Sequence, residues 1–420
     1  MLYAVAARLA TAASGIIPPS DSKAAIAVRA RRGIKRRYAA WAVASRDATR
    51  ALLWMHAPSV GEGLQARPVL TLMRSRRPDV QLAYTFFSPS AEGFSRTLDV
   101  DFRDYLPFDS ASEMGAALDA LLPRALVFSK LDVWPELTRQ ARRREVRLGM
   151  ISATLGAASG RMSRAANWLL RDAYASLDAV GAVDEADADR LAQLGVRSSV
   201  IEVTGDTRFD QVWQRAESVD RQSRLQSHLA SDRPTIVAGS TWPSDETPLL
   251  EAFNETRTRV PGLRLIIAPH EVKTEHLASI EHWAHQNALT LARVDEASGI
   301  ADIVLVDRFG VLGELYALAD AAFVGGGFHA AGLHSVLEPA AFGAPVVFGP
   351  RHEKSRDAMM LLGAGAARSV RDAGDLQRVM LEWFQSPDVR REAGGRARSA
   401  VEHGRGAADR SLKLVERLLA

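Results

Sequence analysis

A repeated alternation of short apolar runs with amphipathic segments constrains the fold more than any other feature of this sequence. Six runs of strand length come first, and like strands covered on both faces they show little polar alternation. They span residues 52–57, 80–86, 125–129, 146–151, 179–183 and 200–203. Amphipathic helical segments lie between them, for example at 134–144 and 185–194. Strands that alternate with helices form βαβ units, so we predict a parallel sheet.

The same alternation restarts after residue 233, which indicates a second domain. Residues 211–233 are polar and charged, and further apolar runs follow at 235–238, 263–268, 303–306, 321–324 and 345–348. From about Asp375 the sequence is helical, and a chain of 420 residues exceeds the usual ~100–200 residues of one domain. We predict an N-terminal segment (1–45), a first Rossmann-like α/β domain (46–210), a linker (211–233) and a second such domain with C-terminal helices (234–420).

The composition excludes several classes of function. Cysteine is absent, which excludes disulfide scaffolds, thiolate nucleophiles and metal clusters held by cysteine. Lysine and arginine outnumber the acids by 53 to 50, and the net charge of +3 is too small to indicate a nucleic-acid partner. Any basic surface that binds a partner must therefore be local.

The N-terminal segment combines an apolar stretch with a basic cluster. Residues 1–17 are mostly small and apolar, but Arg8 interrupts them and they fall short of the ~20 apolar residues of a spanning helix. A cluster of cations and aromatic rings follows, made of Arg29, Arg31, Arg32, Lys35, Arg36, Arg37, Tyr38 and Trp41. This pattern is typical of a helix on an anionic membrane surface, and a solvated helix face is the open alternative. We predict peripheral membrane binding or a short N-terminal anchor.

The first strand-to-helix loop, residues 54–63, places a carboxylate at the carboxyl end of a buried strand. Two doubly wound domains that face each other hold a ligand in the cleft at the carboxyl ends of their strands. The carboxylate of Glu62 in this loop is therefore expected to lie within the cleft rather than on the outer surface. From spacing alone, the simpler interpretation of Glu62 is a helix-start acid that complements the helix dipole.

The loop at 238–243 carries small residues and hydroxyls at a helix start. Ser240 and Thr241 there suit an anion, although an ordinary N-cap has the same composition. This loop and the loop at 323–340 are the candidate phosphate-binding loops of the second domain.

The loop at 323–340 is the most informative. Gly325, Gly326 and Gly327 follow a strand and allow the backbone to approach a phosphate closely. A dinucleotide site needs an acid about 20 residues further on, where this chain has the apolar run 345–348, so nicotinamide binding is disfavoured. Glu338 comes a turn or two after the glycines, where it can reach the hydroxyls of a ribose.

Histidines of the same loop do not indicate a metal site. The ten histidines of the chain include no HExxH pair, so we interpret His329 and His334 as hydrogen-bond donors of the loop rather than as metal ligands.

The ordered set of motifs resembles that of the 3-deoxy-D-manno-octulosonic acid (Kdo) transferases, over roughly residues 50–360. The motifs are Ser-Val-Gly-Glu at 59–62, Gly-Asp-Thr-Arg-Phe-Asp at 205–210, Ala-Gly-Ser-Thr-Trp at 238–242, the three glycines through Leu-Glu-Pro-Ala at 325–340, and Phe-Gly-Pro at 348–350. The resemblance implies the GT-B fold, CMP-Kdo as donor, a lipid A precursor (lipid IVA) as acceptor, and an inverting transfer without a metal or other cofactor. It also implies action at the cytoplasmic face of the bacterial inner membrane, with no nucleic acid as partner.

The resemblance assigns roles to individual residues. It makes Glu62 the catalytic base and places Glu338 in the nucleotide site. We expect donor contacts from Ser240, Thr241, His270, Gly325, Gly326, Gly327, His334, Ser335 and Glu338. We expect acceptor contacts from His56, Ser59, Lys130 and Asp132.

Three departures from the family pattern concern these contacts. Asp132 stands where many members have glutamate, residues 152–155 lack the usual arginine, and His270 alone remains of an Arg-His pair. The alternatives are another GT-B enzyme that uses a UDP-sugar, such as a hexosaminyltransferase or an epimerase, and an inactive paralogue that binds a nucleotide sugar or lipid. Nucleotide preference distinguishes the enzymes, because those alternatives require UDP rather than CMP.

Overall fold

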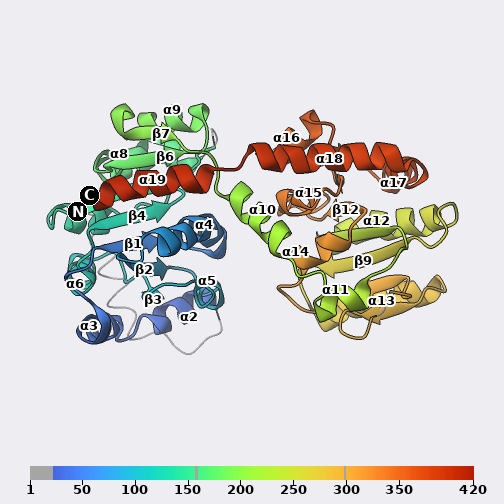
Figure 1. Ribbon diagram of the computed structural model, residues 1–420, viewed down its shortest axis with the longest axis horizontal. Helices are drawn as coiled ribbons and strands as arrows, with labels where there is room; N and C mark the ends of the chain where they lie inside the picture. Colours follow the sequence, from blue (N-terminus) through green and yellow to red (C-terminus); the bar gives the residue numbers. More distant parts are fainter. Residues whose placement is uncertain (1–21, 157–158, 298) are drawn as a thin grey trace. The chain divides into compact units, whose positions relative to one another are not determined.

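The computed structural model describes residues 22–156, 159–297 and 299–420 and divides into two compact units. The first unit comprises the chain up to Gln211 together with Arg405–Ala420, and the second comprises Val212–Gly404 (Figure 1). Each unit contains one seven-stranded parallel sheet with helices packed around it.

The sheet of the first unit has the strand order β3-β2-β1-β4-β5-β6-β7. Its strands are β1 (Leu52–His56), β2 (Gln81–Phe86), β3 (Phe102–Tyr105), β4 (Ala125–Ser129), β5 (Arg147–Ala153), β6 (Ala179–Ala182) and β7 (Ile201–Val203). Its helices are α2 (Lys23–Ala30), α3 (Ile34–Ser45), α4 (Val60–Arg76), α5 (Ala91–Ser95), α6 (Ala111–Leu121), α7 (Pro135–Arg142), η1 (Gly160–Met162), α8 (Arg164–Ala175), α9 (Glu185–Gln193), η2 (Ser198–Val200) and α19 (Ala407–Leu419). Every residue of β1, β2 and β4 is buried, as expected of central strands covered on both faces.

The second unit repeats this design with the strand order β10-β11-β9-β8-β12-β13-β14. Its strands are β8 (Thr235–Thr241), β9 (Arg264–Pro269), β10 (Leu291–Arg293), β11 (Ile303–Leu305), β12 (Ala321–Val324), β13 (Val346–Phe348) and β14 (Ala367–Ser369). Its helices are α10 (Arg208–Ser218), which begins in the first unit, α11 (Arg224–Leu229), α12 (Pro243–Arg257), α13 (Thr274–Gln286), α14 (Leu312–Leu315), η3 (Tyr316–Leu318), α15 (Leu337–Ala341), α16 (Arg356–Gly363), α17 (Ala373–Gln385) and α18 (Pro387–His403).

The structure contains all eleven predicted strands within a few residues of their predicted bounds, and three that the sequence did not indicate. The additional strands β3, β10 and β14 are short edge strands. Their sequences FRDY, LAR and ARS include charged residues, because one side of an edge strand faces solvent. They therefore lack the apolar run by which the central strands were recognised.

The last helix corrects the predicted domain division. We predicted that residues 234–420 form one domain, but α19 packs against β4, β5, β6 and α4 of the first unit (Figure 1). Leu412, Leu414 and Val415 are buried in that unit's core, and the Asp210 carboxylate accepts from the amides of Gly406 and Ala408 at the helix start. The predicted linker 211–233 is also largely helical, and α11 contributes Leu229 to a core of the second unit.

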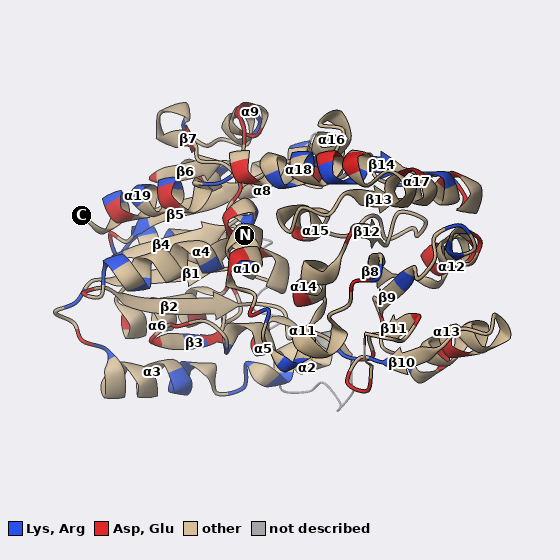
Figure 2. Ribbon diagram, turned by 45° about the vertical axis from the view of Figure 1, so that its right-hand side comes forward, with Lys and Arg blue, Asp and Glu red and all other residues tan. Residues whose placement is uncertain are grey.

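Helices α2 and α3 belong to the first unit's fold, which changes the interpretation of the basic cluster (Figure 2). Arg31 is only 4% exposed and donates to the carbonyl oxygens of Leu106 at 2.7 Å and Phe87 at 3.1 Å. Burial lowers the pKa of Arg31 to about 10. Arg37 forms an ion pair with Asp104 at 2.7 Å. Both arginines therefore hold α2 and α3 on the sheet.

The exposed cations that remain in this cluster include Arg32, Lys35 and Arg36. The apolar stretch 1–17 lies outside the residues that the structure describes. Among those that it does describe, no helix combines the length and apolar character that crossing a membrane requires.

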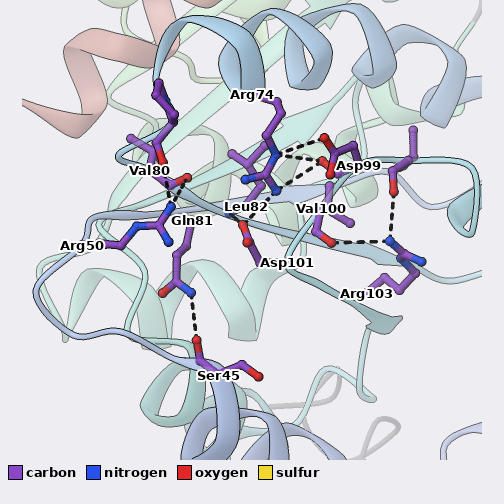
Figure 3. A network of polar contacts seen from close by, with 12 residues as sticks. Ser45, Arg50, Arg74, Val80, Gln81, Leu82, Asp99, Val100, Asp101 and Arg103 are labelled. Atoms are coloured by element: carbon purple, nitrogen blue, oxygen red, sulfur yellow. Dashed lines mark hydrogen bonds and ion pairs between the residues drawn. The ribbon is translucent and has the colours of Figure 1, made fainter.

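A polar network at the amino ends of the strands fixes the junction between α3 and β2 (Figure 3). The Gln81 amide donates to the carbonyl of Ser45 at 2.9 Å, at the end of α3. The Asp101 carboxylate accepts from the Leu82 amide at 2.7 Å and pairs with Arg74 of α4 at 2.9 Å. These bonds tie two helices to the same strand.

We predict that Arg31→Ala destabilises the first unit by roughly 3 kcal/mol, because it leaves buried backbone carbonyls without donors. Urea unfolding followed by circular dichroism measures the change. The control is Arg32→Ala, which removes an exposed cation one residue further along. Equal stability of the two variants would show that the Arg31 hydrogen bonds contribute nothing measurable.

Candidate functional site

The strand order of each sheet reverses at a defined point. In the first unit the chain proceeds from β1 to β2 and β3 and then returns to β4 on the other side of β1. In the second unit β12 lies beside β8 on the side opposite β9. Ligands of doubly wound folds bind at such reversals, outside the carboxyl ends of the strands. The loops that follow β1, β4, β8 and β12 carry most of the predicted site residues.

Glu62 and Lys130 lie together at the reversal of the first unit. Glu62 is in the first turn of α4 after β1, and Lys130 directly follows β4. Their side chains approach at 3.5 Å between Nζ and Oε1, with 17% of the Glu62 side chain and 41% of the Lys130 side chain exposed. The Ser59 hydroxyl donates to the other Glu62 oxygen, and the Ser129 hydroxyl donates to the Glu62 carbonyl at 2.8 Å. The carboxylate is thus positioned and still accessible.

Lys130 occupies an unfavourable backbone conformation. Its φ of 74° is in the left-handed region, which costs a residue with a side chain on the order of 1–3 kcal/mol. Ser240, at the corresponding reversal of the second unit, has a φ of 55°. Such strain concentrates at functional sites, and both residues were predicted as ligand contacts.

Tyr84 is a neighbour of Glu62 that the sequence analysis missed. Its hydroxyl is buried and has no hydrogen-bond partner in the described part of the chain. Burial, and secondarily the charge of Glu62, raises the pKa of Tyr84. A Cβ atom on Gly63 would lie 2.7 Å from the Tyr84 hydroxyl oxygen and 2.5 Å from the Phe94 ring, so glycine is needed beside Glu62. A tyrosine within a strand-length, largely apolar run was the only sequence signal.

His56 has a structural role, contrary to the expectation that it contacts the acceptor. It is fully buried, and its Nε2 accepts from the Trp134 indole at 3.0 Å while Nδ1 lies 3.0 Å from the Thr85 hydroxyl. Because indole only donates, Nε2 carries no proton and the ring is neutral. Burial lowers the pKa of His56 to about 3. Both ring nitrogens are engaged within the protein, and the side chain has no exposed surface.

Asp132 is paired with Arg161 of η1, a residue that the sequence analysis did not select. The Tyr174 hydroxyl of α8 also donates to the Leu131 carbonyl at 2.8 Å. The loop that carries Lys130 and Asp132 is therefore held by the segment 160–175.

In the second unit, Thr241 does not offer its hydroxyl to a ligand as expected. The side chain is fully buried, and its hydroxyl donates to Glu246 at 2.7 Å. Glu246 also pairs with His276 at 2.8 Å. Ser240 is partly exposed and remains a candidate contact.

The glycine loop differs from the expectation that its amides hold phosphate at Gly325 and Gly326, whereas the contact expected of the Gly327 amide stays a prediction. The Gly325 amide donates to the Gly239 carbonyl at 2.9 Å, and the Gly326 amide donates to Asp245 at 2.7 Å. The other Asp245 oxygen accepts from the Phe328 amide at 2.9 Å. The glycines serve close packing instead, because a Cβ on Gly325 would lie 2.2 Å from the Ser240 carbonyl oxygen. Asp245 was missed, although an acid in the first turn of α12 was visible in the sequence.

Glu338 has the features of a ligand contact. It lies in the first turn of α15, and no hydrogen bond or ion pair joins its carboxylate to another described residue. Burial raises the pKa of Glu338, and the nearby Arg215 opposes this effect. Burial, and secondarily the charge of Glu338, also raises the pKa of Tyr316. A largely buried carboxylate without a partner is costly and suits a ligand that donates hydrogen bonds.

Four aromatic rings gather at the reversal of the second unit, and we call Trp242, His270, His329 and His334 the Trp–His cluster. The Trp242 ring lies 4.1 Å from that of His329 and 4.5 Å from that of His270 between centroids. The rings of His270 and His334 are also 4.5 Å apart, and the Trp242 indole donates to His334 Nε2 at 3.3 Å. Ser335 is exposed beside them. Across residues 22–156, 159–297 and 299–420, no group of three or more His, Cys, Asp or Glu side chains could hold a metal ion.

Comparison with solved structures concerns the fold. The UDP-GlcNAc 2-epimerase from Neisseria meningitidis, bound to UDP-GlcNAc, matches with a TM-score of 0.64 at 13% identity over 88% of this chain and 99% of the epimerase chain. A glycosyltransferase from Rickettsia africae ESF-5 matches with a TM-score of 0.59 at 10% identity over 88% and 99% of the two chains. This likeness confirms the predicted GT-B fold with two parallel-sheet α/β domains.

Comparison of sequences concerns the family. The family described as 3-deoxy-D-manno-octulosonic-acid transferase (kdotransferase) matches residues 29–211. A 3-deoxy-D-manno-octulosonic acid transferase from Bordetella pertussis is 30% identical over 87% of this chain and 86% of its own length. The corresponding enzyme from Haemophilus influenzae is 25% identical over the same shares. This chain therefore belongs to the Kdo transferase family of glycosyltransferases.

Proposed function

We propose that this glycosyltransferase transfers Kdo from CMP-Kdo to a lipid A precursor, lipid IVA, with Glu62 as the general base. The observation that carries the proposal is the position of Glu62 at the strand-order reversal, where Ser59 and Lys130 orient its accessible carboxylate. Family membership supports the transfer of Kdo, and the resemblance of the Ser-Val-Gly-Glu motif at 59–62 supports the role of the base.

The chemistry follows from these groups. The acceptor hydroxyl attacks the anomeric carbon of Kdo from the side opposite CMP, and its proton passes to the Glu62 carboxylate. The bond from the anomeric carbon to the phosphate oxygen breaks, and its electron pair leaves with CMP. Lys130 holds the base in place at 3.5 Å and supplies a positive charge for an acceptor that carries phosphates. We propose no role for a metal ion or other cofactor.

The donor side of the proposal belongs to the second unit. Glu338 would accept hydrogen bonds from the ribose, because its carboxylate has no partner among the described residues. Ser240 at the end of β8, together with His270, His334 and Ser335 on the loops after β9 and β12, would contact the remainder of the donor. A UDP-sugar enzyme and an inactive binding paralogue are the alternatives, and the positioned Glu62 disfavours the inactive one.

We also propose that the protein works at an anionic membrane surface, at the cytoplasmic face of the inner membrane. The acyl chains of the proposed acceptor keep it in a bilayer. Arg32, Lys35 and Arg36 are exposed on the first unit and can attract anionic lipid, whereas Arg31 and Arg37 are committed to the fold.

Replacing the base gives the direct test of the activity. Glu62→Gln should lower the transfer rate by about 10²–10⁴, the usual contribution of general-base catalysis, with CMP affinity unchanged. Mass spectrometry of the product formed from CMP-Kdo and a tetra-acylated lipid A precursor measures this rate. Glu185→Gln is a matched control, because Glu185 is an exposed acid in the first turn of α9 in the same unit. Similar turnover by both variants would remove Glu62 from the mechanism.

Glu338→Gln should weaken CMP binding while stabilising the free protein. Burial raises the pKa of Glu338, so the folded protein loses stability as pH rises through that pKa, and removing the ionisable group relieves this loss at pH 8. Losing a hydrogen bond to a charged group should weaken CMP by roughly 1.5 kcal/mol, about 10-fold. Calorimetric titration and thermal unfolding measure the two effects, with Glu275→Gln in α13 as control. Unchanged CMP affinity would contradict the donor placement.

Membrane binding should depend on the exposed cations and on salt. Each basic residue near anionic lipid contributes about 1 kcal/mol, so replacing Arg32 and Arg36 with Ala should lower vesicle binding about 30-fold. Arg221→Ala with Arg224→Ala removes the same charge from an exposed part of the second unit and serves as control. Flotation with anionic vesicles at two salt concentrations measures binding. Binding that neither salt nor substitution reduces would instead indicate insertion of residues 1–17.

A further inference from the structure

The Trp–His cluster lies where a ligand of the second unit is expected. Its members come from the loops after β8, β9 and β12, which are the three neighbouring strands at the centre of the sheet. The reversal of strand order falls between two of them, β8 and β12. Three of the four rings are imidazoles, the side-chain type that can gain a positive charge by taking up a proton.

The observed hydrogen bond defines the protonation state of His334. The Trp242 indole can only donate, so His334 Nε2 must accept at 3.3 Å, and the imidazole is neutral with its proton on Nδ1. A second proton on His334 would remove the acceptor and break this bond. It would also place a positive charge 4.5 Å from the ring of His270.

The surrounding charges do not stabilise a protonated cluster. Burial lowers the pKa of His334, and so do His270 and His329, while Asp245 opposes them. The Asp245 carboxylate already accepts from the amides of Trp242, Gly326 and Phe328. Glu271 faces His270 but pairs with Lys273 at 2.5 Å. An imidazolium at His334 therefore lacks a compensating negative charge until an anion arrives.

We propose that the Trp–His cluster binds the anionic group of a phosphate-bearing ligand and takes up a proton as it binds. The anion replaces the missing negative charge and favours the imidazolium form. Protonation of His334 releases the Trp242 indole, and Asp245 links the Trp242 loop to the glycine loop, so both loops respond to the same event. That the ligand is the CMP-sugar donor rests on the proposed function, whereas the proton uptake does not.

A proton-linked site binds more weakly as pH rises. Between the pKa of the imidazole in the free protein and its higher pKa in the complex, the affinity falls by up to 10-fold per pH unit for one proton taken up. The phosphate of CMP itself titrates near pH 6, so the measurement compares variants at equal pH, and sulfate is added as a probe whose charge stays constant.

The test uses calorimetric titration of the full chain with CMP, UMP and sulfate at pH 6.5 and pH 8.0, in two buffers of different ionisation enthalpy. His334→Gln keeps an acceptor for the indole but cannot become positive. His329→Phe keeps the stacked ring without its charge and covers the case in which the first variant does not fold. His282→Asn, an exposed histidine on α13, is the control.

We expect the wild type and the control to take up more protons on binding than the cluster variants. At pH 6.5 the wild type and the control should bind more tightly than His334→Gln. The ratio of their affinity to that of the variant should be about 10-fold smaller at pH 8.0. Equal proton uptake and equal pH dependence in all four proteins would overturn the proposal, as would no binding of any probe. Preference for UMP over CMP would overturn the donor assignment alone, and the proton count with UMP would still decide the role of the cluster.

Discussion

The reversal of strand order beside the first strand of each sheet is the constraint on which the candidate site depends. Crossovers between parallel strands are right-handed, so helices that follow β1 and β4 must lie on opposite faces of the sheet, and the same holds for β8 and β12. The loops that lead into these helices separate at the reversal and leave room for a ligand. Glu62 and Lys130 meet there in the first unit, and Trp242 and His334 meet there in the second.

The central strands could be predicted because strands covered on both faces appear in the sequence as short apolar runs. A strand buried on both faces must be mostly apolar, and β1, β4 and β12 are, apart from His56 and Ser129 at the ends of β1 and β4. Edge strands such as β3 and β14 carry charged residues and give no such run. The position of α19 was unpredictable for another reason. An apolar helix face shows that a partner is needed, but it does not show which of two similar sheets provides it, and this helix returns to the first unit.

The fold leaves two of the predicted site carboxylates available to a ligand, and their contacts with donor and acceptor stay predictions. These carboxylates are those of Glu62 and Glu338. The wrong predictions concern hydrogen-bond donors that already have an acceptor within the protein. Thr241 and the Gly326 amide looked like anion contacts, but the acids Glu246 and Asp245 in the first turn of α12 accept their hydrogen bonds. A buried donor must be satisfied, and when an acid of the same helix start can reach it, the internal bond prevails over a ligand.

The same hydrogen bond, from a tryptophan indole to a histidine, occurs in both units, and the burial of the histidine determines its effect. In each unit a tryptophan indole donates to the Nε2 atom of a histidine, from Trp134 to His56 and from Trp242 to His334. His56 is fully buried and its other nitrogen contacts Thr85, so no charge can form there and the contact only fixes the loop after β4. His334 is partly exposed and lies among titratable rings. The same hydrogen bond can therefore open in the second unit, because water or an anion can accept a hydrogen bond from the protonated ring in place of the contact with the indole.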